Sequence, residues 1–181
     1  MVFILLIVMA CSNPAEQELD SFYERAEKRD LSILFGLTLK PRGTNEDGSY
    51  KVHKIQYNQK NEEPLTIPVF DDETSEKEWL DSTLFDIKEF ALSKKLNQEN
   101  LYSEVKSFSD SVVDLYDYLG VISIESYPHL GEFIIFQVNA TDQAVYIKDT
   151  STVNHPSWIK FFKETSPDRK NWYYRKKELS P

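Results

Sequence analysis

Few side chains in this sequence have the type and spacing for acid–base, nucleophilic or metal chemistry. The chain holds three histidines and one cysteine. His53, His129 and His155 lie more than 20 residues apart from one another, so no HExxH or similar spacing places two of them on one helix face for zinc. A single cysteine excludes an internal disulfide and a multi-thiolate metal site. We therefore expect no metal ion and no cofactor.

Motifs for phosphate binding and hydrolysis are also missing. Only five glycines occur, and none forms a GxGxxG, P-loop or GxSxG pattern. Acidic clusters occur at 46–47, 62–63 and 71–73. Glycoside hydrolysis needs two carboxyls roughly 5 to 10 Å apart in a cleft, which adjacent loop residues seldom provide. If one histidine is functional, our first choice is His129 in the turn-like sequence YPHLG.

Aromatic residues gather near the C-terminus, interleaved with basic ones. Such a mixture is typical of protein-binding hot spots and of carbohydrate-facing surfaces. The competing interpretation is a last strand whose alternate aromatics fill the core, and we favour it because large aromatics are usually buried. The candidate binding residues are Trp158, Trp172, Tyr173, Tyr174 and His129.

The chain begins with an uncharged apolar run, Val2 to Met9, followed by Ala10 and Cys11. The run is far shorter than the roughly 20 residues of a membrane-spanning helix and fits the hydrophobic region of a signal peptide. Val8-Met9-Ala10-Cys11 resembles the lipobox of bacterial lipoproteins, with Val8 and Met9 in place of the usual leucine and small residue. The alternative is a buried N-terminal strand in which Cys11 is a small hydrophobic residue.

The resemblance to bacterial lipoproteins implies a signal peptide over residues 1–10, cleavage before Cys11 and acylation of that cysteine. Residues 11–181 then form one domain, held on the lipid bilayer of the cell envelope at its periplasmic or outer face, with the outer membrane favoured. We expect this domain to bind another envelope protein, a toxin or a glycan. The alternative is an envelope hydrolase that combines His129 with carboxylates of the central helices.

Composition agrees with one folded domain. The chain has 181 residues, 40% of them hydrophobic, which suffices for a single core. Its net charge of −9 argues against nucleic acid as a partner, because phosphate binding needs clustered lysine and arginine.

Hydrophobic periodicity defines the elements that must position any site. The spacing predicts a helix over 14–29, a hairpin of strands over 31–39 and 50–57, and an edge strand over 65–70. Helical continuation through Leu34 is the alternative to the first strand. Two apolar stripes predict two central amphipathic helices: Leu80, Leu84, Ile87 and Ala91, then Leu101, Val105, Phe108, Val112, Leu115 and Leu119.

From Gly120 onward the pattern changes to β-branched and aromatic runs, which predict an antiparallel meander over 121–149. A short helix follows near 155–165, with Trp158, Ile159 and Phe162 on one side, and then a last strand near 171–177. The sequence thus predicts an α+β fold, in which an antiparallel sheet of five to six strands packs against the two central helices and an N-terminal helix.

Overall fold

The computed structural model describes residues 14–44, 48, 50–52, 54–70, 77 and 85–177. Cys11, His53, Leu80 and Leu84 lie outside the described residues, as do the acidic clusters at 46–47 and 71–73.

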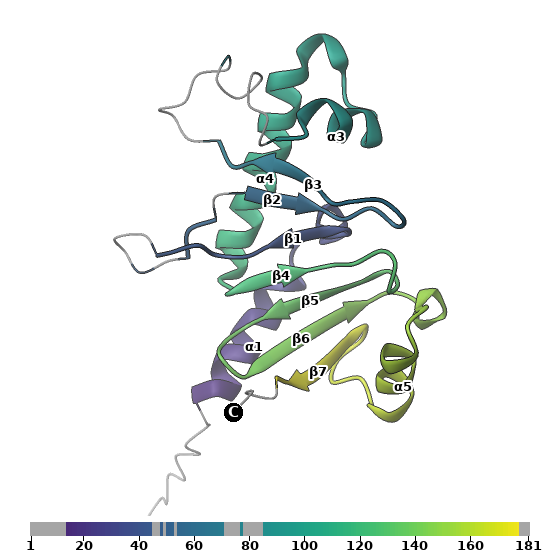
Figure 1. The fold of residues 1–181 in the computed structure, drawn as a ribbon. Helices are drawn as coiled ribbons and strands as arrows, with labels where there is room; N and C mark the ends of the chain where they lie inside the picture. The colour runs from purple at the N-terminus through teal and green to yellow at the C-terminus, as the bar shows by residue number, and fades with distance from the viewer. Residues whose placement is uncertain are drawn as a thin grey trace, which may run out of the picture.

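The fold is α+β, as the sequence predicts, and its sheet is antiparallel throughout (Figure 1). Seven strands are joined in the order β3-β2-β1-β4-β5-β6-β7, one more than the upper end of the expected five to six. The strands are β1 (Leu37–Leu39), β2 (Lys54–Tyr57), β3 (Leu65–Pro68), β4 (Ser123–Glu125), β5 (Phe133–Gln137), β6 (Asp142–Ile147) and β7 (Trp172–Lys176).

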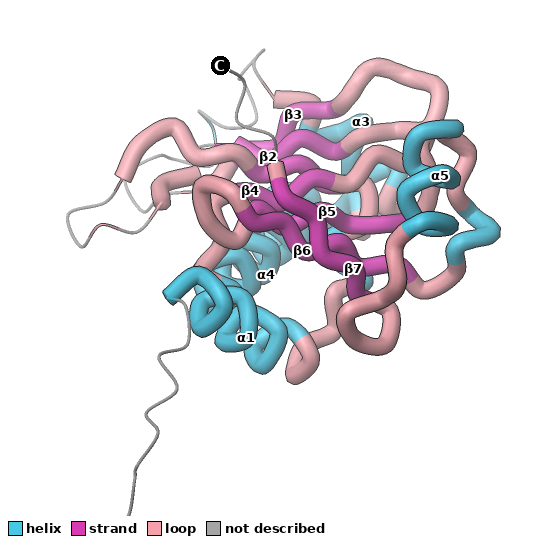
Figure 2. Tube along the Cα trace, turned by 90° about the horizontal axis from the view of Figure 1, so that it is seen from below, coloured by secondary structure: helices cyan, strands magenta, loops and turns pink. Residues whose placement is uncertain are grey.

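Helices cover both faces of the sheet. Figure 1 shows α1 and α4 behind the strands, and Figure 2 shows α5 across the strands from them. The described helices are α1 (Pro14–Ala26), α3 (Ile87–Ser93), α4 (Leu101–Leu119) and α5 (Pro156–Glu164), with short 3-10 turns η1 (Ser32–Leu34), η2 (Gln98–Asn100) and η3 (Thr150–Thr152).

The two faces of β5, β6 and β7 enter two separate hydrophobic clusters, because side chains alternate along a strand. Phe136, Ala144 and Trp172 pack with α1 and α4 in the larger cluster. Phe133 and Val145 pack with Phe162 and other side chains of α5 in the smaller one. Trp158, Ile159 and Phe162 all join this smaller cluster, which confirms the predicted apolar side of the short helix.

The first predicted strand is wrong over residues 31–36. Residues Ser32–Leu34 form a 3-10 turn, and only Leu37–Leu39 is strand. Leu31 and Leu34 are both buried, and their spacing of three places them on one side of a 3-10 turn. The apolar alternation therefore continued across two different local structures. The hairpin itself is confirmed, because β1 pairs antiparallel with β2.

Helix α4 is confirmed and ends before Gly120, but its buried face is rotated from the predicted stripe. Ser109 and Tyr116 are buried, whereas Phe108 and Leu115 are only partly buried. Both polar groups find partners: Ser109 Oγ donates to the carbonyl of Pro68 at 2.7 Å and Tyr116 Oη to that of Ile122 at 2.8 Å. These bonds make their burial possible.

Candidate binding site

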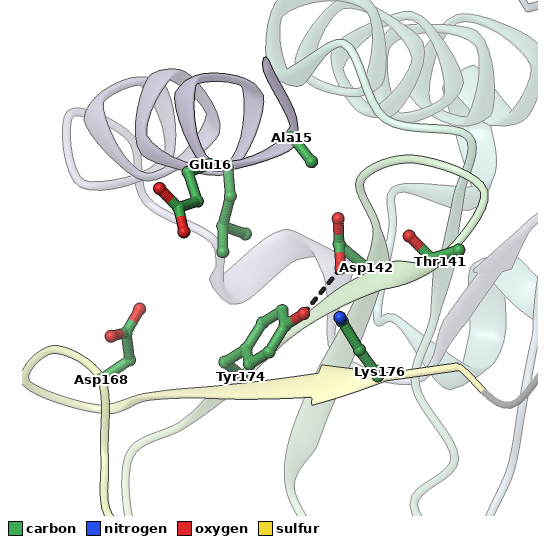
Figure 3. Close-up of a pocket in the computed structure, with 8 residues that line it drawn as sticks. Ala15, Glu16, Thr141, Asp142, Asp168, Tyr174 and Lys176 are labelled. Carbon is green, nitrogen blue, oxygen red and sulfur yellow. Dashed lines mark hydrogen bonds between the residues drawn. The ribbon is translucent and has the colours of Figure 1, made fainter. Parts of the chain in front are cut away.

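A groove of about 700 Å³ lies between the N-terminal half of α1 and the edge strand β7 with its neighbour β6 (Figure 3). Figure 3 shows Glu16 reaching down from α1, and Tyr174 and Lys176 reaching up from β7. The groove is lined by Ala15, Glu16, Leu19, Thr141, Asp142, Asp168, Tyr174 and Lys176. It combines three carboxylates with one ammonium group, a phenol and a short apolar wall, a mixture suited to polar ligands.

Strand register explains why these β7 residues share the groove. Lys176 lies opposite Asp142 and Tyr174 opposite Ala144 in the β6–β7 ladder. Because alternate residues face opposite sides of a sheet, Tyr174 and Lys176 face α1, whereas Tyr173 and Arg175 face α5. The sequence of β7 thus divides its side chains between two different surfaces.

Asp142 is the centre of a hydrogen-bond network at the floor of the groove. Its residue is only 4% exposed. Tyr174 Oη donates to Asp142 Oδ1 at 2.7 Å, and Asn139 Nδ2 donates to Oδ2 at 2.9 Å. Asn139 Nδ2 also lies 3.2 Å from Glu18 Oε2. This network joins α1, the β5–β6 turn and β7, and so fixes both walls of the groove.

The network sets the protonation states of its members. Burial acts to raise the pKa of Asp142, but hydrogen bonds from Tyr174, Asn139 and Thr141 outweigh it and lower that pKa overall. Burial and the bond to Asp142 raise the pKa of Tyr174 to about 12. At neutral pH the pair is therefore a carboxylate and a neutral phenol, with the proton on the tyrosine.

Arg169 fixes the loop that carries Asp168. Its guanidinium Nη2 lies 2.6 Å from Asp20 of α1, and its Cζ lies 4.8 Å from the ring centre of Tyr23. The buried Tyr23 hydroxyl has no hydrogen-bond partner by distance and angle in the described part of the chain. Burial is the main cause of the raised pKa of Tyr23, and Asp168 raises it further. Asp168 thus lies close to a buried phenol at one end of the groove.

The outer edge of β7 is only partly closed. Ile147 N–H donates to Asn171 O at 3.0 Å and Lys177 N–H to Thr141 O at 2.7 Å. Because inward and outward bonding alternate in an antiparallel ladder, the backbone groups of residues 172, 174 and 176 point away from β6.

Of these three residues, only Trp172 has its outward backbone groups hydrogen-bonded within the described chain. Its N–H donates to Arg169 O at 2.9 Å, and its carbonyl accepts from Asp168 N–H at 2.9 Å. The N–H and C=O groups of Tyr174 and Lys176 have no backbone partner in the described ranges. This open edge runs directly along the groove.

The opposite edge of the sheet is closed. Asp86 Oδ2 accepts the N–H of Thr66 in β3 at 2.7 Å, and Asp86 N–H donates to Thr66 O at 2.8 Å. Natural sheets usually protect their edges in such ways, since unpaired edges recruit other strands. Within the part of the chain that the structure describes, β7 is therefore the sheet edge with free backbone groups.

The structure does not bring the predicted aromatic residues together on one surface. Trp172 is 2% exposed and packs in the larger cluster. Trp158, which belongs to α5, and Tyr173 of β7 are partly buried in the smaller cluster, on the other side of the sheet. Tyr174 alone of the predicted aromatic set lines the groove. The favoured interpretation, a last strand whose alternate aromatics fill the core, therefore describes Trp172, whereas Tyr173 and Tyr174 are only partly buried.

His129 lies in an exposed turn between β4 and β5, with its ring centre 5.9 Å from that of Tyr127. Across the residues with described positions, it has no ion pair with a carboxylate. In the same part of the chain, no three His, Cys, Asp or Glu side chains are grouped to hold a metal ion.

The four charged groove residues were not assigned to a site from the sequence: Glu16, Asp142, Asp168 and Lys176. Strand alternation in NWYYRKK does place Tyr174 and Lys176 on one side. No local pattern, however, indicates that β7 pairs with β6 or that α1 crosses above them.

The described helices include none long and apolar enough to span a bilayer. No protein family, curated protein or solved structure matches this chain.

Proposed function

We propose that this chain is a lipid-anchored interaction protein of the bacterial cell envelope. Cys11 carries the acyl chains, and the groove with the open edge of β7 is the binding site for a partner. The observation that carries the binding function is the open edge, because the backbone groups of Tyr174 and Lys176 beside the groove have no backbone partner among the described residues. The anchor rests on the lipobox resemblance of residues 8–11.

The tether and the groove are close together. Only Ser12 and Asn13 separate Cys11 from Pro14, where α1 begins. At no more than about 3.5 Å per residue, the Cα atoms of Cys11 and Pro14 lie within about 11 Å of each other. Ala15 and Glu16 already line the groove. An acylated Cys11 therefore holds this binding site near the bilayer surface.

The chemistry of the groove supports binding rather than catalysis. A general acid needs a raised pKa and a free path to the substrate. Asp142 has the opposite properties, since its carboxylate is buried, its pKa is lowered, and Tyr174 and Asn139 occupy both of its oxygens. We assign Asp142 to holding the groove in shape.

Incorporation of labelled palmitate by the full chain in bacterial cells tests the anchor. We expect label on the wild type and none on Cys11→Ala, because the acyl chains are attached to the cysteine. Two or three acyl chains, at about 0.8 kcal/mol per buried methylene, also hold the wild type in the membrane fraction. Ser12→Ala is the matched control and keeps its label. Label retained by Cys11→Ala contradicts the proposed anchor.

A further inference from the structure

We propose that the open edge of β7 binds an extended segment of a partner protein, which adds an eighth strand to the sheet and alternates acidic and basic side chains. This inference rests on the binding part of the proposed function and is independent of the lipid anchor. The sequence leaves open whether the ligand is an envelope protein, a toxin or a glycan. This inference specifies a protein.

Backbone geometry defines where the segment lies. The outward N–H and C=O groups of Tyr174 and Lys176 offer two donors and two acceptors at alternate positions of one strand. Arg169 already pairs with Trp172 as an isolated bridge on the same edge. An added strand thus extends, along the edge of β7, the pairing that Arg169 makes with Trp172. Main-chain bonds of this kind give affinity without requiring a particular sequence, and side chains then give specificity.

Charge on the α5 side of β7 calls for acidic side chains in the partner. Arg175 and Lys177 lie on this side and are exposed. Neither forms an ion pair with another described residue. The Arg175 guanidinium Cζ lies 5.2 Å from the ring centre of Trp158, which holds it beside the strand. Opposite charges on neighbouring strands stabilise pairing, so acidic residues fit here.

Acidic residues on the α1 side of β7 favour basic side chains in the partner. Glu16 and Asp168 are exposed and line the groove next to the same strand, together with the buried Asp142. Lys176 is the one cation among the lining residues, so this side is negative overall. A basic side chain that enters the groove meets Glu16 and Asp168. Because successive residues of a strand face opposite sides, the two charge requirements together specify an alternating segment.

A second copy of this chain fits the edge poorly. Pairing of β7 with itself brings Arg175, Lys176 and Lys177 of each copy close to the same residues of the other. Like charges opposite each other destabilise a strand pair, and natural edge strands use them to block self-association. The positive charges on β7 therefore oppose self-association of this edge and favour pairing with a strand of complementary charge.

Hydrogen exchange in the full chain, kept in detergent, tests the proposal directly. The probe is a capped peptide of about eight residues with alternating glutamate and lysine. We expect the peptide to slow exchange at the amides of Tyr174 and Lys176. The amides of Tyr173 and Arg175, which already bond to β6, serve as internal controls and stay unchanged.

Altered peptides separate backbone pairing from charge attraction. The same peptide with alternate backbone nitrogens methylated keeps its charges but loses donors along one edge. We expect it to bind at least about tenfold more weakly, since each lost hydrogen bond accounts for about fivefold. Peptides of glutamate alone or lysine alone bind more weakly than the alternating one, because one of the two sides then repels them.

Two variants of one residue test the strand edge from the side of the protein. Lys176→Pro removes an outward N–H and costs no bond within the sheet, a position where proline is tolerated. We expect Lys176→Pro to bind the peptide at least about fivefold more weakly than Lys176→Thr, because both variants lose the same charge and only the threonine keeps the N–H. If Lys176→Pro does not fold, the exchange and methylated-peptide measurements still decide the question.

Three results would overturn the proposal. The first is no binding at about 1 mM peptide, and the second is equal binding of the methylated peptide. The third is protection of Tyr174 and Lys176 that rises with protein concentration without peptide, which assigns the edge to a second copy. A chain that lacks acyl label but shows peptide-dependent protection refutes only the anchor.

Discussion

The Tyr174 hydroxyl lies 2.7 Å from Oδ1 of Asp142 and donates a hydrogen bond to this buried carboxylate. The bond links β7 to the start of β6, at the floor of the groove and beside the open edge. It lowers the pKa of Asp142 and contributes to the raised pKa of Tyr174. The same contact therefore influences the stability of the fold at both extremes of pH.

Tyr174→Phe removes the donor and leaves Asp142 with fewer partners. We expect a loss of about 1 to 3 kcal/mol in the free energy of unfolding at neutral pH, measured by urea denaturation. Tyr173→Phe, one residue away on the other side of the strand, is the matched control and is expected to change little. Equal stability of Tyr174→Phe and the wild type would show that the bond contributes nothing.

Acid sensitivity follows from the lowered pKa of Asp142. In the unfolded chain this carboxyl takes up its proton near its ordinary value of 3.8, and in the folded chain only at lower pH. The stabilisation is thus present above pH 3.8 and is lost as the pH falls through the folded value. We expect the Tyr174→Phe variant to lose less stability over this acid range, measured as urea midpoints at successive pH values.

Alkaline titration examines the other partner. The pKa of Tyr174 is raised from 10.0 to about 12, so the folded state holds this proton more tightly than the unfolded chain does. The resulting stabilisation is complete below pH 10 and declines as the pH rises toward 12. The difference in phenolate absorbance between wild type and Tyr174→Phe reports this residue alone. A midpoint near 10 in that difference contradicts the assignment.

Elements with strong local periodicity were predictable from the sequence, whereas the groove was not. Helix α4 and the meander repeat their apolar residues at helical and strand spacing, and each is held largely by neighbours in sequence. The strand predicted over residues 31–36 was wrong because a 3-10 turn and a strand can contain the same short apolar run. The burial of Ser109 was not predicted because its hydrogen-bond partner, the Pro68 carbonyl, lies 41 residues away in sequence.

The candidate site depends on pairing over still longer separations. Glu16, Asp142 and Lys176 meet only because α1 crosses the sheet at β6 and because β7 returns to the outer side of β6. A charged residue on its own has no periodic signal that marks it for a groove. The open edge is likewise a property of the ladder, since it depends on which backbone groups of β7 point away from β6.

Asp86 closes the edge at β3, and its removal tests how much that closure contributes. Asp86→Ala leaves the Thr66 N–H without its side-chain acceptor, now 2.7 Å away. We expect a loss of about 1 to 2 kcal/mol in the free energy of unfolding, together with more light scattering on storage. Asp86→Asn keeps an acceptor oxygen and is expected to lose less than half as much. Identical behaviour of both variants argues against an edge-closing role.

Gly131, beside the start of β5, tests the packing of the segment that leads into α5. A Cβ atom at this position would lie 2.8 Å from Val153 Cα, and the backbone φ is +142°. Gly43 has a φ of +155° and no atom within 4 Å of the same Cβ position, so Gly43→Ala isolates the backbone strain. That strain costs about 1 to 3 kcal/mol in either variant.

The clash with Val153 comes in addition, and only in Gly131→Ala. We expect this variant to unfold with a free energy about 1 to 3 kcal/mol below that of Gly43→Ala. The cause is that backbone atoms, unlike a long side chain, cannot move aside cheaply. Thermal and urea denaturation of both variants measure the difference. Equal stability of the two would mean that the segment around Val153 yields freely and that α5 is not held at this point.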